Sequence, residues 1–332
     1  MSWLCGLCMH GLQSQPLSRM VWEHRQMGTT FRIVLYSDDS LRAAAAVQAA
    51  FARVDTLNAI LSDYLPGSEL NRLCAQAGSG SWTPVSRDLW RVLRASQEIA
   101  ARSGGAFDLS IGPLSRLWRR GIRRQELPDS QQIEAARQLV DYRQIRLRRG
   151  RQAQLGLPGM QLDPGGIGQG YAADEAWKVL RKAGYAASLV DAGGDIFAGA
   201  PPPGRPGWEV EVTALDSLGQ PWQRSLFVRN CGITTSGDTY RYVEYQGRRY
   251  SHIIDPRSGL GAERQRKATV LAPDCTRADV LATTLCILGP ESGFRVLDRM
   301  LRRGPRAATL IETDGPRLRQ YSWRSFPASG SE

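Results

Sequence analysis

Apolar and polar positions follow two periods along the chain and predict alternating strands and helices. The segment 31–36 (Phe-Arg-Ile-Val-Leu-Tyr) alternates and predicts a strand. The segment 41–60 is rich in alanine, and its larger apolar residues recur at helical spacing, so it predicts a helix. The same patterns predict strands around 145 and 155 and at 208–212, 225–228, 240–245, 248–254, 267–272, 307–311 and 318–321, and helices at 86–104, 130–140, 171–183, 276–288 and 292–303.

These elements predict an α+β fold with mixed, largely antiparallel sheets flanked by helices. Short turns such as Gln246-Gly247 join neighbouring strands, which favours antiparallel pairing. The chain has 332 residues, 42% of them hydrophobic, enough for one large core. Residues 1–20 show no period, so we predict an N-terminal tail at 1–20, a single large domain at 21–325 and a C-terminal tail at 326–332.

The chain carries a net charge of +11, which raises the question of nucleic-acid binding. Its basic residues are scattered or form local runs, such as those within 119–124 and 146–151. Aromatic residues do not interleave with these runs as they do in single-strand binders. We therefore predict no nucleic-acid partner; the excess charge predicts a solvated basic face or attraction to an anionic ligand.

Six cysteines are present, and only Cys5 and Cys8 form a CxxC pair without a second pair to complete a zinc set. Free thiols in a reducing compartment are the favoured interpretation.

No apolar run is long enough to cross a membrane, and the N-terminus lacks the pattern of a secretory signal. We expect no membrane span and a cytoplasmic location; the alternative is a periplasmic or membrane-anchored protein whose true start differs.

Two glycine-rich turns, each with an acid, follow predicted strands and indicate one glycine-lined cleft. They are Asp163 to Gly170, at the head of a predicted helix, and Asp191 to Asp195. Backbone N–H groups at a helix N-terminus bind phosphate, and glycines let it approach closely. The spacing fits neither the Rossmann fingerprint nor a P-loop. A purely structural turn is the alternative.

Three further groups could carry chemistry. Asp279 and Thr283 are four residues apart on a predicted helix and share a face, where hard oxygen ligands suit Mg²⁺ or Ca²⁺; an ordinary polar helix face is the alternative. His252 ends a predicted strand and could act as a general base, or simply be hydrogen-bonded in a loop. The segment 233–238 is rich in hydroxyls and suits phosphate or ribose contacts, or a strand end.

The ordered set of these motifs resembles the ApbE family of FAD:protein FMN transferases. The motifs are MGTTF at 27–31, SDY at 62–64, GGAFDLSIGP at 104–113, LDPGGIGQGYAAD at 162–174, DAGGDI at 191–196, TSGD at 235–238, SHIIDPRSG at 251–259 and ADVLAT at 278–283. The resemblance covers about residues 25 to 300 and implies an ApbE-like fold.

The resemblance implies a Mg²⁺-dependent phosphoryl transfer with FAD as the substrate. Such enzymes attach FMN through a phosphoester to a threonine of an acceptor protein and release AMP. The resemblance also implies the local sequence of the acceptor, in which the modified threonine lies in a short Asp-Gly/Ser-Xaa-Ser/Thr-Gly/Ser-Ala-Thr sequence. The alternatives are a Mg²⁺-dependent FAD pyrophosphatase giving FMN and AMP, and a non-catalytic FAD-binding protein.

The resemblance also implies roles for individual residues. His252 matches the histidine that deprotonates the acceptor hydroxyl. The residues expected to contact FAD are Met27, Tyr64, Ala106, Phe107, Asp108, Asp163, Gln169 and Ile254. The residues expected to bind the metal are Asp279, Thr283, Gly166 through its carbonyl, and Thr276.

Two positions depart from the family pattern in the first glycine turn. Gln169 replaces a lysine found in many relatives, so a cation near the phosphates is lost although the amide can still hydrogen-bond. Pro164 replaces the usual leucine and stiffens the turn. In the second turn, Asp191 and Asp195 are expected to shape the cleft rather than react.

Overall fold

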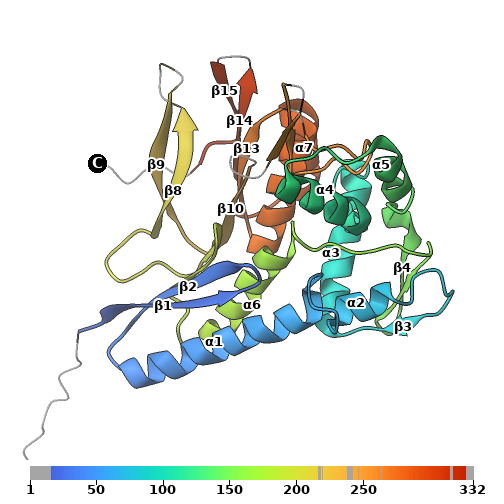
Figure 1. The fold of residues 1–332 in the computed structure, drawn as a ribbon. Helices are drawn as coiled ribbons and strands as arrows, with labels where there is room; N and C mark the ends of the chain where they lie inside the picture. Colours follow the sequence, from blue (N-terminus) through green and yellow to red (C-terminus); the bar gives the residue numbers. More distant parts are fainter. Residues whose placement is uncertain are drawn as a thin grey trace, which may run out of the picture.

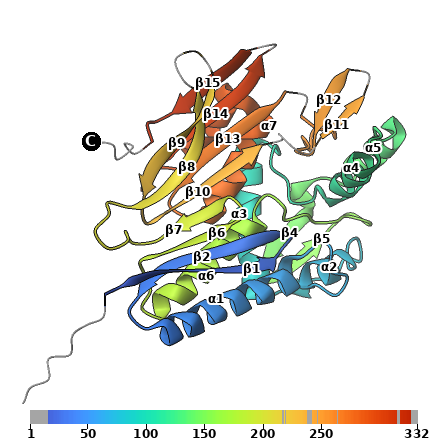
Figure 2. The ribbon, with the colours of Figure 1, turned by 60° about the vertical axis from the view of Figure 1, so that its left-hand side comes forward.

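An eight-stranded sheet forms the centre of the molecule (Figures 1 and 2). The computed structural model describes residues 16–326 except 216–217, 219, 238–241, 246, 263 and 315–316. Each neighbouring pair in this sheet is antiparallel, as the sequence predicted. In spatial order the strands are β1 (Ser18–Gln26), β2 (Thr29–Ser37), β6 (Ser188–Ala192), β7 (Asp195–Ala198), β10 (Cys231–Gly237), β13 (Arg266–Ala272), β14 (Ala307–Asp314) and β15 (Arg317–Trp323).

Three smaller antiparallel sheets surround the central one (Figure 2). The hairpin of β8 (Trp208–Leu215) and β9 (Pro221–Val228) packs on one face of the central sheet. The hairpin of β11 (Tyr242–Tyr245) and β12 (Arg248–Ser251) lies near helix α4 (Gly112–Arg124). The third sheet consists of β3 (Thr83–Pro84), β5 (Gln152–Leu155) and β4 (Ile145–Arg148).

Three long helices cover the other face of the central sheet. Helix α6 (Gly168–Lys182) contacts β6 and β7, helix α7 (Cys275–Met300) contacts β10 and β13, and helix α1 (Ser40–Leu61) packs against α6. The apolar side chains between this face and the helices form the main core of the protein. The remaining helices are α2 (Glu69–Cys74), α3 (Arg87–Ser103), α5 (Ser130–Arg137) and a short 3₁₀ helix, η1 (Tyr142–Gln144).

Helix α7 bends at Gly289-Pro290, where Gly289 adopts a left-handed φ of 75°. Proline removes a helical N–H donor and glycine tolerates positive φ, so the bend falls between the two helices predicted at 276–288 and 292–303. Among the described residues α7 is the one helix long and apolar enough to cross a membrane. More than half of its apolar window is buried inside the fold, as in the core helix of a globular protein.

Arg53 joins three helices in a half-buried ion-pair network. From α1 it donates to both oxygens of Asp88 on α3, at 3.0 and 2.5 Å, and to Glu175 on α6 at 2.7 Å. The hydroxyl of Tyr171 also donates to Asp88, at 2.7 Å. Burial, the largest effect, raises the pKa of both carboxylates, but hydrogen bonds outweigh it: those from Arg53 and Tyr171 lower the pKa of Asp88, and those from Lys178 and then Arg53 lower the pKa of Glu175. The network thus fixes α6 relative to α1 and α3.

Two predicted boundaries were wrong. Strand β1 begins at Ser18, so residues 18–20 belong to the sheet and not to the tail predicted at 1–20. At the other end Phe326 is buried with an apolar cluster under β8 and β9, although it was assigned to the C-terminal tail. The basic run within 119–124 lies in α4, directly after the fully buried Trp118.

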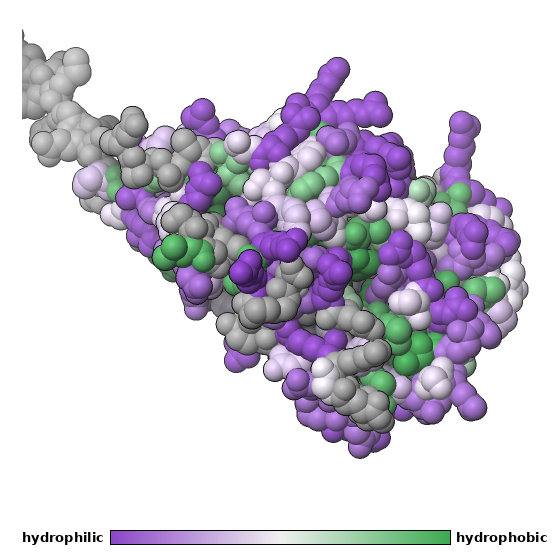
Figure 3. Space-filling view, turned by 90° about the horizontal axis from the view of Figure 1, so that it is seen from above, coloured by the Kyte–Doolittle hydropathy of each residue, from purple (hydrophilic) through white to green (hydrophobic). Residues whose placement is uncertain are grey.

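Seen from above, the surface is mostly hydrophilic, with hydrophobic residues exposed in separate small groups (Figure 3). Large apolar side chains that are exposed in the described part of the chain are scattered in sequence: Leu17, Val21, Leu41, Tyr64, Leu65, Leu218 and Trp222. Of these residues, Tyr64 is the one that the family resemblance assigns to FAD binding. Its ring is 71% exposed and is therefore accessible to a flat ligand.

Candidate active site

The first glycine turn lies beside the Ala-Phe-Asp motif. The N–H of Asp163 donates to the carbonyl of Leu109 at 2.9 Å, and Ile111 bridges Gln161 in parallel. Within the turn, Asp163 Oδ1 accepts the N–H of Gly165 at 2.8 Å. Helix α6 begins just after it; its N-cap residue Ile167 makes no side-chain hydrogen bond, and the N–H of Gly168 donates to the carbonyl of Pro164 at 2.8 Å. Two motifs separated in sequence therefore build one wall.

Helices α6 and α7 meet at Gly170 and Asp279. The N–H of Gly170 donates to Asp279 Oδ2 at 3.2 Å. A Cβ at Gly170 would lie 2.5 Å from the carbonyl oxygen of Cys275 and 2.8 Å from the Cβ of Asp279. Since real Cβ atoms do not approach so closely, only glycine permits this helix contact. Gly170, which the sequence placed in a phosphate-binding turn, thus also determines how closely α6 packs against Asp279.

Thr283 lies one helical turn beyond Asp279 and faces the glycine turn. A Cβ at Gly166 would lie 3.2 Å from Thr283 Oγ1 and 3.3 Å from the Phe107 ring. Thr283 Oγ1 also lies 3.2 Å from the hydroxyl of Ser236 on β10. The structure therefore brings together Gly166, Asp279 and Thr283, three of the four residues assigned to the metal.

Asp279 is a buried carboxylate whose pKa is raised well above its usual range. Burial is the largest cause, the charge of Asp195 adds to it, and the N–H of Gly170 opposes it. Among the described residues no ion pair neutralises Asp279. A buried carboxylate of this kind is ionised only beside a cation, and the carboxylate of Asp279 and the hydroxyl of Thr283 are hard oxygen donors. The donor set therefore fits a magnesium ion.

Thr276, the fourth residue assigned to the metal, is held by Asp174 of α6. Asp174 accepts the N–H groups of Cys275 and Thr276 at 2.8 and 2.9 Å, and the hydroxyl of Thr276. Burial and then Asp274 raise the pKa of Asp174 to about 7. Asp174 thus caps the first turn of α7 and engages the Thr276 hydroxyl, which favours a structural role for Thr276 over the metal ligation that the resemblance implies; no contact here tests that ligation.

The β1–β2 turn reaches the start of α6. Gln169 Nε2 donates to the carbonyl of Met27 at 3.3 Å, and a Cβ at Gly168 would lie 3.6 Å from Met27 Cε. Met27 adopts a left-handed φ of 53°, which turns its backbone toward this helix. Met27 and Gln169, both assigned to FAD from the sequence, are therefore neighbours.

The second glycine turn connects β6 to β7. Gly193 and Gly194 both have positive φ, the geometry of a tight hairpin turn, and Asp191 Oδ1 accepts the N–H of Gly194 at 2.8 Å. A Cβ at Gly193 would overlap the hydroxyl of Thr29, at 2.0 Å. Asp195 is buried behind the turn, and burial raises its pKa to about 7. The expected structural role of this turn agrees with these contacts.

Asp108 shapes the Ala-Phe-Asp loop from inside. Its Oδ1 accepts the N–H and the hydroxyl of Ser110 at 2.8 and 2.7 Å, and its Oδ2 accepts the N–H of Tyr142 at 2.8 Å. Burial raises its pKa against these hydrogen bonds. Ala106 and Phe107 are also buried. Contact of Ala106 and Asp108 with FAD stays a prediction, since both oxygens of Asp108 are used within the fold.

Arg119, which the sequence did not single out, lies among the candidate site residues. It donates to Asp63 and, at 2.7 Å, to Asp163. Its guanidinium carbon is 4.7 Å from the centre of the Tyr64 ring. The sequence shows Arg119 only as part of a basic run. The salt bridges depend on α4 packing beside the glycine turn, which no local pattern indicates.

His252 directly follows β12 and is half-buried. The segment around it is fastened to α4: Trp118 Nε1 donates to the carbonyl of Gly259 at 2.9 Å, and Ile254 packs in an apolar cluster with Trp118. Ile254 also bridges Gly261. The histidine segment and Arg119 are therefore positioned by the same helix. Catalysis by His252 and an FAD contact by Ile254 stay predictions.

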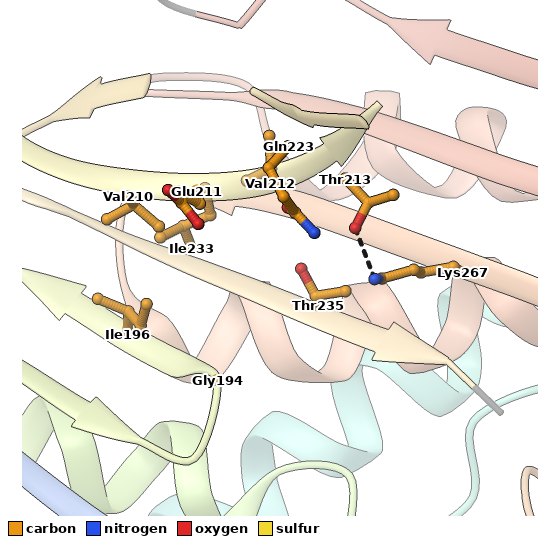
Figure 4. Close-up of a pocket in the computed structure, with 10 residues that line it drawn as sticks. All are labelled: Gly194, Ile196, Val210, Glu211, Val212, Thr213, Gln223, Ile233, Thr235 and Lys267. Atoms are coloured by element: carbon orange, nitrogen blue, oxygen red, sulfur yellow. Dashed lines mark hydrogen bonds between the residues drawn. The ribbon is translucent and has the colours of Figure 1, made fainter. Parts of the chain in front are cut away.

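A cavity of about 300 Å³ lies on the other face of β10 (Figure 4). Thr235 lines it, whereas the next residue, Ser236, contacts Thr283, because alternate strand residues point to opposite faces. Lys267 lies in this cavity and donates to Thr213 at 2.6 Å. The cavity is thus separated by the sheet from the site described above. Asp238, at the end of the hydroxyl-rich segment, lies outside the described residues.

The fold and this site define an α+β protein with a glycine turn at the start of α6 beside a carboxylate and a hydroxyl on α7. The chain belongs to the ApbE family, whose sequence model matches residues 27–306. It is 36% identical over 290 residues to a protein of Treponema pallidum, covering 82% of this chain and 79% of the relative. It is 32% identical to one of Salmonella typhimurium, covering 92% and 88%. Both relatives are named FAD:protein FMN transferase.

Solved structures agree with the sequence relatives. The apo form of the flavinyl transferase ApbE from Pseudomonas stutzeri superposes with a TM-score of 0.81 at 29% identity, covering 93% of this chain and 95% of that one. The flavin transferase ApbE from Vibrio cholerae gives a TM-score of 0.82 at 25% identity, covering 92% and 97%. The predicted family and the ApbE-like fold are confirmed.

Proposed function

We propose that this protein is an FAD:protein FMN transferase, which moves FMN from FAD to an acceptor protein and releases AMP. The observation that carries the proposal is the meeting of helices α6 and α7. There the N–H of Gly170 donates to Asp279, and a Cβ added at Gly166 in the glycine turn would lie 3.2 Å from Thr283 Oγ1. Membership of the ApbE family and the shared names of its relatives support the same function.

The residues present fit a magnesium ion, for which Asp279, Thr283 and the carbonyl of Gly166 would be the ligands. Magnesium, when bound, would neutralise charge on the diphosphate of FAD. The glycine turn lets the phosphates approach the backbone at the start of α6, where N–H groups other than those already bonded within the fold donate to them. Tyr64, exposed beside Arg119, offers a flat ring to FAD. The chain itself therefore supplies both phosphate positioning and a contact for a planar group.

The transfer forms one bond and breaks one. The threonine oxygen of the acceptor bonds to the phosphorus of the FMN part, while the bond from that phosphorus to the bridging oxygen breaks and AMP leaves with the oxygen. His252 takes the proton of the threonine hydroxyl as general base. The acceptor is a protein with an accessible threonine in the short family sequence. In-line positioning of the two oxygens is the main contribution that a protein can make to such a step.

Product analysis distinguishes the transferase from its two alternatives. The protein is incubated with FAD, Mg²⁺ and a peptide carrying the acceptor sequence, and AMP and flavin-labelled peptide are both measured. The proposal predicts AMP and a fluorescent peptide heavier by one FMN less one water, in equal amounts. AMP and free FMN without labelled peptide would identify a hydrolase, since water then replaces threonine. FAD binding without AMP would identify a non-catalytic flavin-binding protein.

A further inference from the structure

Arg119 is enclosed by three residues of the candidate site. From α4 its guanidinium donates to Asp63 in the loop before α2 and to Asp163 in the first glycine turn. The same group stacks on Tyr64, 4.7 Å from the ring centre. A Cβ at Gly165 would lie 4.0 Å from Arg119 Nη2, so the cation also reaches the glycine turn. One side chain therefore ties two loops together at the start of α6.

The two carboxylates of this cluster oppose the binding of an anion, and Arg119 reduces this repulsion by neutralising one of their charges. Asp63 and Asp163 are both largely buried, and burial and then the charge of Asp163 raise the pKa of Asp63. With Arg119 the cluster carries one negative charge; without it, two carboxylates would lie beside a turn proposed to receive a diphosphate. Buried like charges without a partner are strongly unfavourable.

The position of Arg119 is fixed by the helix that carries it. The preceding residue, Trp118, is fully buried, donates to the carbonyl of Gly259 and stacks near Tyr250, with ring centres 5.8 Å apart. A guanidinium has five N–H donors, and its two carboxylate partners use only part of them. By contrast Arg120, the next residue, is exposed. The chain thus provides a matched pair of adjacent arginines, one inside the cluster and one outside it.

We propose that Arg119 is a positioning residue that sets the affinity for FAD. It holds Tyr64 and Asp163 in place for the flavin nucleotide and offsets the negative charge of Asp63 and Asp163 beside the glycine turn. This inference rests on the proposed function, because FAD is the ligand whose diphosphate the turn receives. Arg119 acts before the chemical step, so its loss changes binding more than turnover.

The test compares Arg119→Gln with Arg120→Gln. The dissociation constant for FAD is measured from flavin fluorescence without Mg²⁺, and the KM for FAD and kcat are measured with Mg²⁺ and the acceptor peptide. Loss of the charge-assisted contacts predicts a dissociation constant and KM raised about 10-fold to 100-fold for Arg119→Gln, with kcat changed much less. Arg120→Gln is expected to stay within about twofold of the wild type. Equal affinities of the two variants would overturn the inference.

Two further variants separate charge compensation from general damage to the fold. Arg119→Lys keeps the charge and loses the fork geometry, so intermediate affinity is expected. Asp63→Asn added to Arg119→Gln removes one unpaired carboxylate and is expected to restore part of the affinity. No recovery in this double variant, with a native circular dichroism spectrum, would overturn the charge argument. Wild-type protein that binds no FAD would instead refute the proposed function itself.

Discussion

The N–H of Gly170 donates to the carboxylate of Asp279 across the interface of helices α6 and α7. Because Asp279 is buried without an ion pair among the described residues, we expect Asp279→Ala to abolish metal-dependent turnover. AMP release at saturating FAD is predicted to fall about a hundredfold or more at every Mg²⁺ concentration. Glu291→Gln, an exposed change on the same helix, is the control. Normal AMP release by Asp279→Ala would show that the metal lies elsewhere.

Thr276 and Thr283 are expected to differ in their effect on the metal. Thr283→Val is predicted to raise the Mg²⁺ concentration needed for half-maximal AMP release by about tenfold. Thr276→Val removes the hydroxyl that donates to Asp174, so it is predicted to lower the free energy of unfolding by about 1–2 kcal/mol. It should leave the Mg²⁺ requirement unchanged. An equal rise for both variants would instead support Thr276 as a ligand.

His252→Asn is expected to slow transfer to the acceptor without weakening the binding of FAD. Removing a general base lowers the rate of proton-coupled attack by about 10²–10⁴-fold. The rate is measured from the fluorescence of the labelled peptide, and affinity from flavin fluorescence. His24→Asn is the matched control, since His24 contacts Asp55 on α1. If both histidine variants transferred FMN equally well, His252 would not be the base.

Gly170→Ala tests the close contact between α6 and α7. Its new methyl group would lie 2.5 Å from the Cys275 carbonyl oxygen, so the helices must move apart. Overpacking of this kind is expected to cost about 1–3 kcal/mol of stability and to reduce AMP release by displacing Asp279. Chemical denaturation measures the first effect. Gly67→Ala meets no atom within 4 Å and should change neither quantity.

The ion pairs of Arg53 predict a pH-dependent contribution to stability. Asp88 and Glu175 have pKa values lowered in the folded state, so their contribution is complete above the pKa of the unfolded chain. It is lost as the pH falls through the lower folded values. Arg53→Met is expected to cost about 2–3 kcal/mol near pH 7, after allowance for partial exposure, and less below about pH 4. Urea unfolding of the wild type and of Arg53→Met across this pH range checks the sign. A difference in the free energy of unfolding that grows in acid would contradict the prediction.

Much of the fold follows from local pattern, because strands such as β2 and helices such as α1 repeat their apolar residues with a clear period. The two glycine turns and the spacing of Asp279 and Thr283 could also be identified in this way. Strand β1 was missed because it is an edge strand with alternating burial and many polar residues. Helix α4 was missed because arginines dominate its exposed face and hide the buried Trp118.

Arg119 and Asp174 could not be identified from local pattern because their roles depend on partners far away in sequence. The partners of Arg119 at Asp63 and Asp163 are 56 and 44 residues distant. Nothing near Arg119 in the sequence indicates either carboxylate. The cap that Asp174 provides likewise crosses from one helix to another. Such contacts become visible only once the helices are placed.

Helix α7 receives its first-turn cap from a side chain 101 residues earlier, since Asp174 binds the N–H of Cys275. An excised segment 275–300 would begin without this cap. Contacts between parts of the chain so far apart close large loops and slow folding. Division of the chain anywhere between α6 and α7 would therefore separate two halves of one reaction centre. Activity would return only when both halves reassemble, which makes turnover a direct reporter of complete folding.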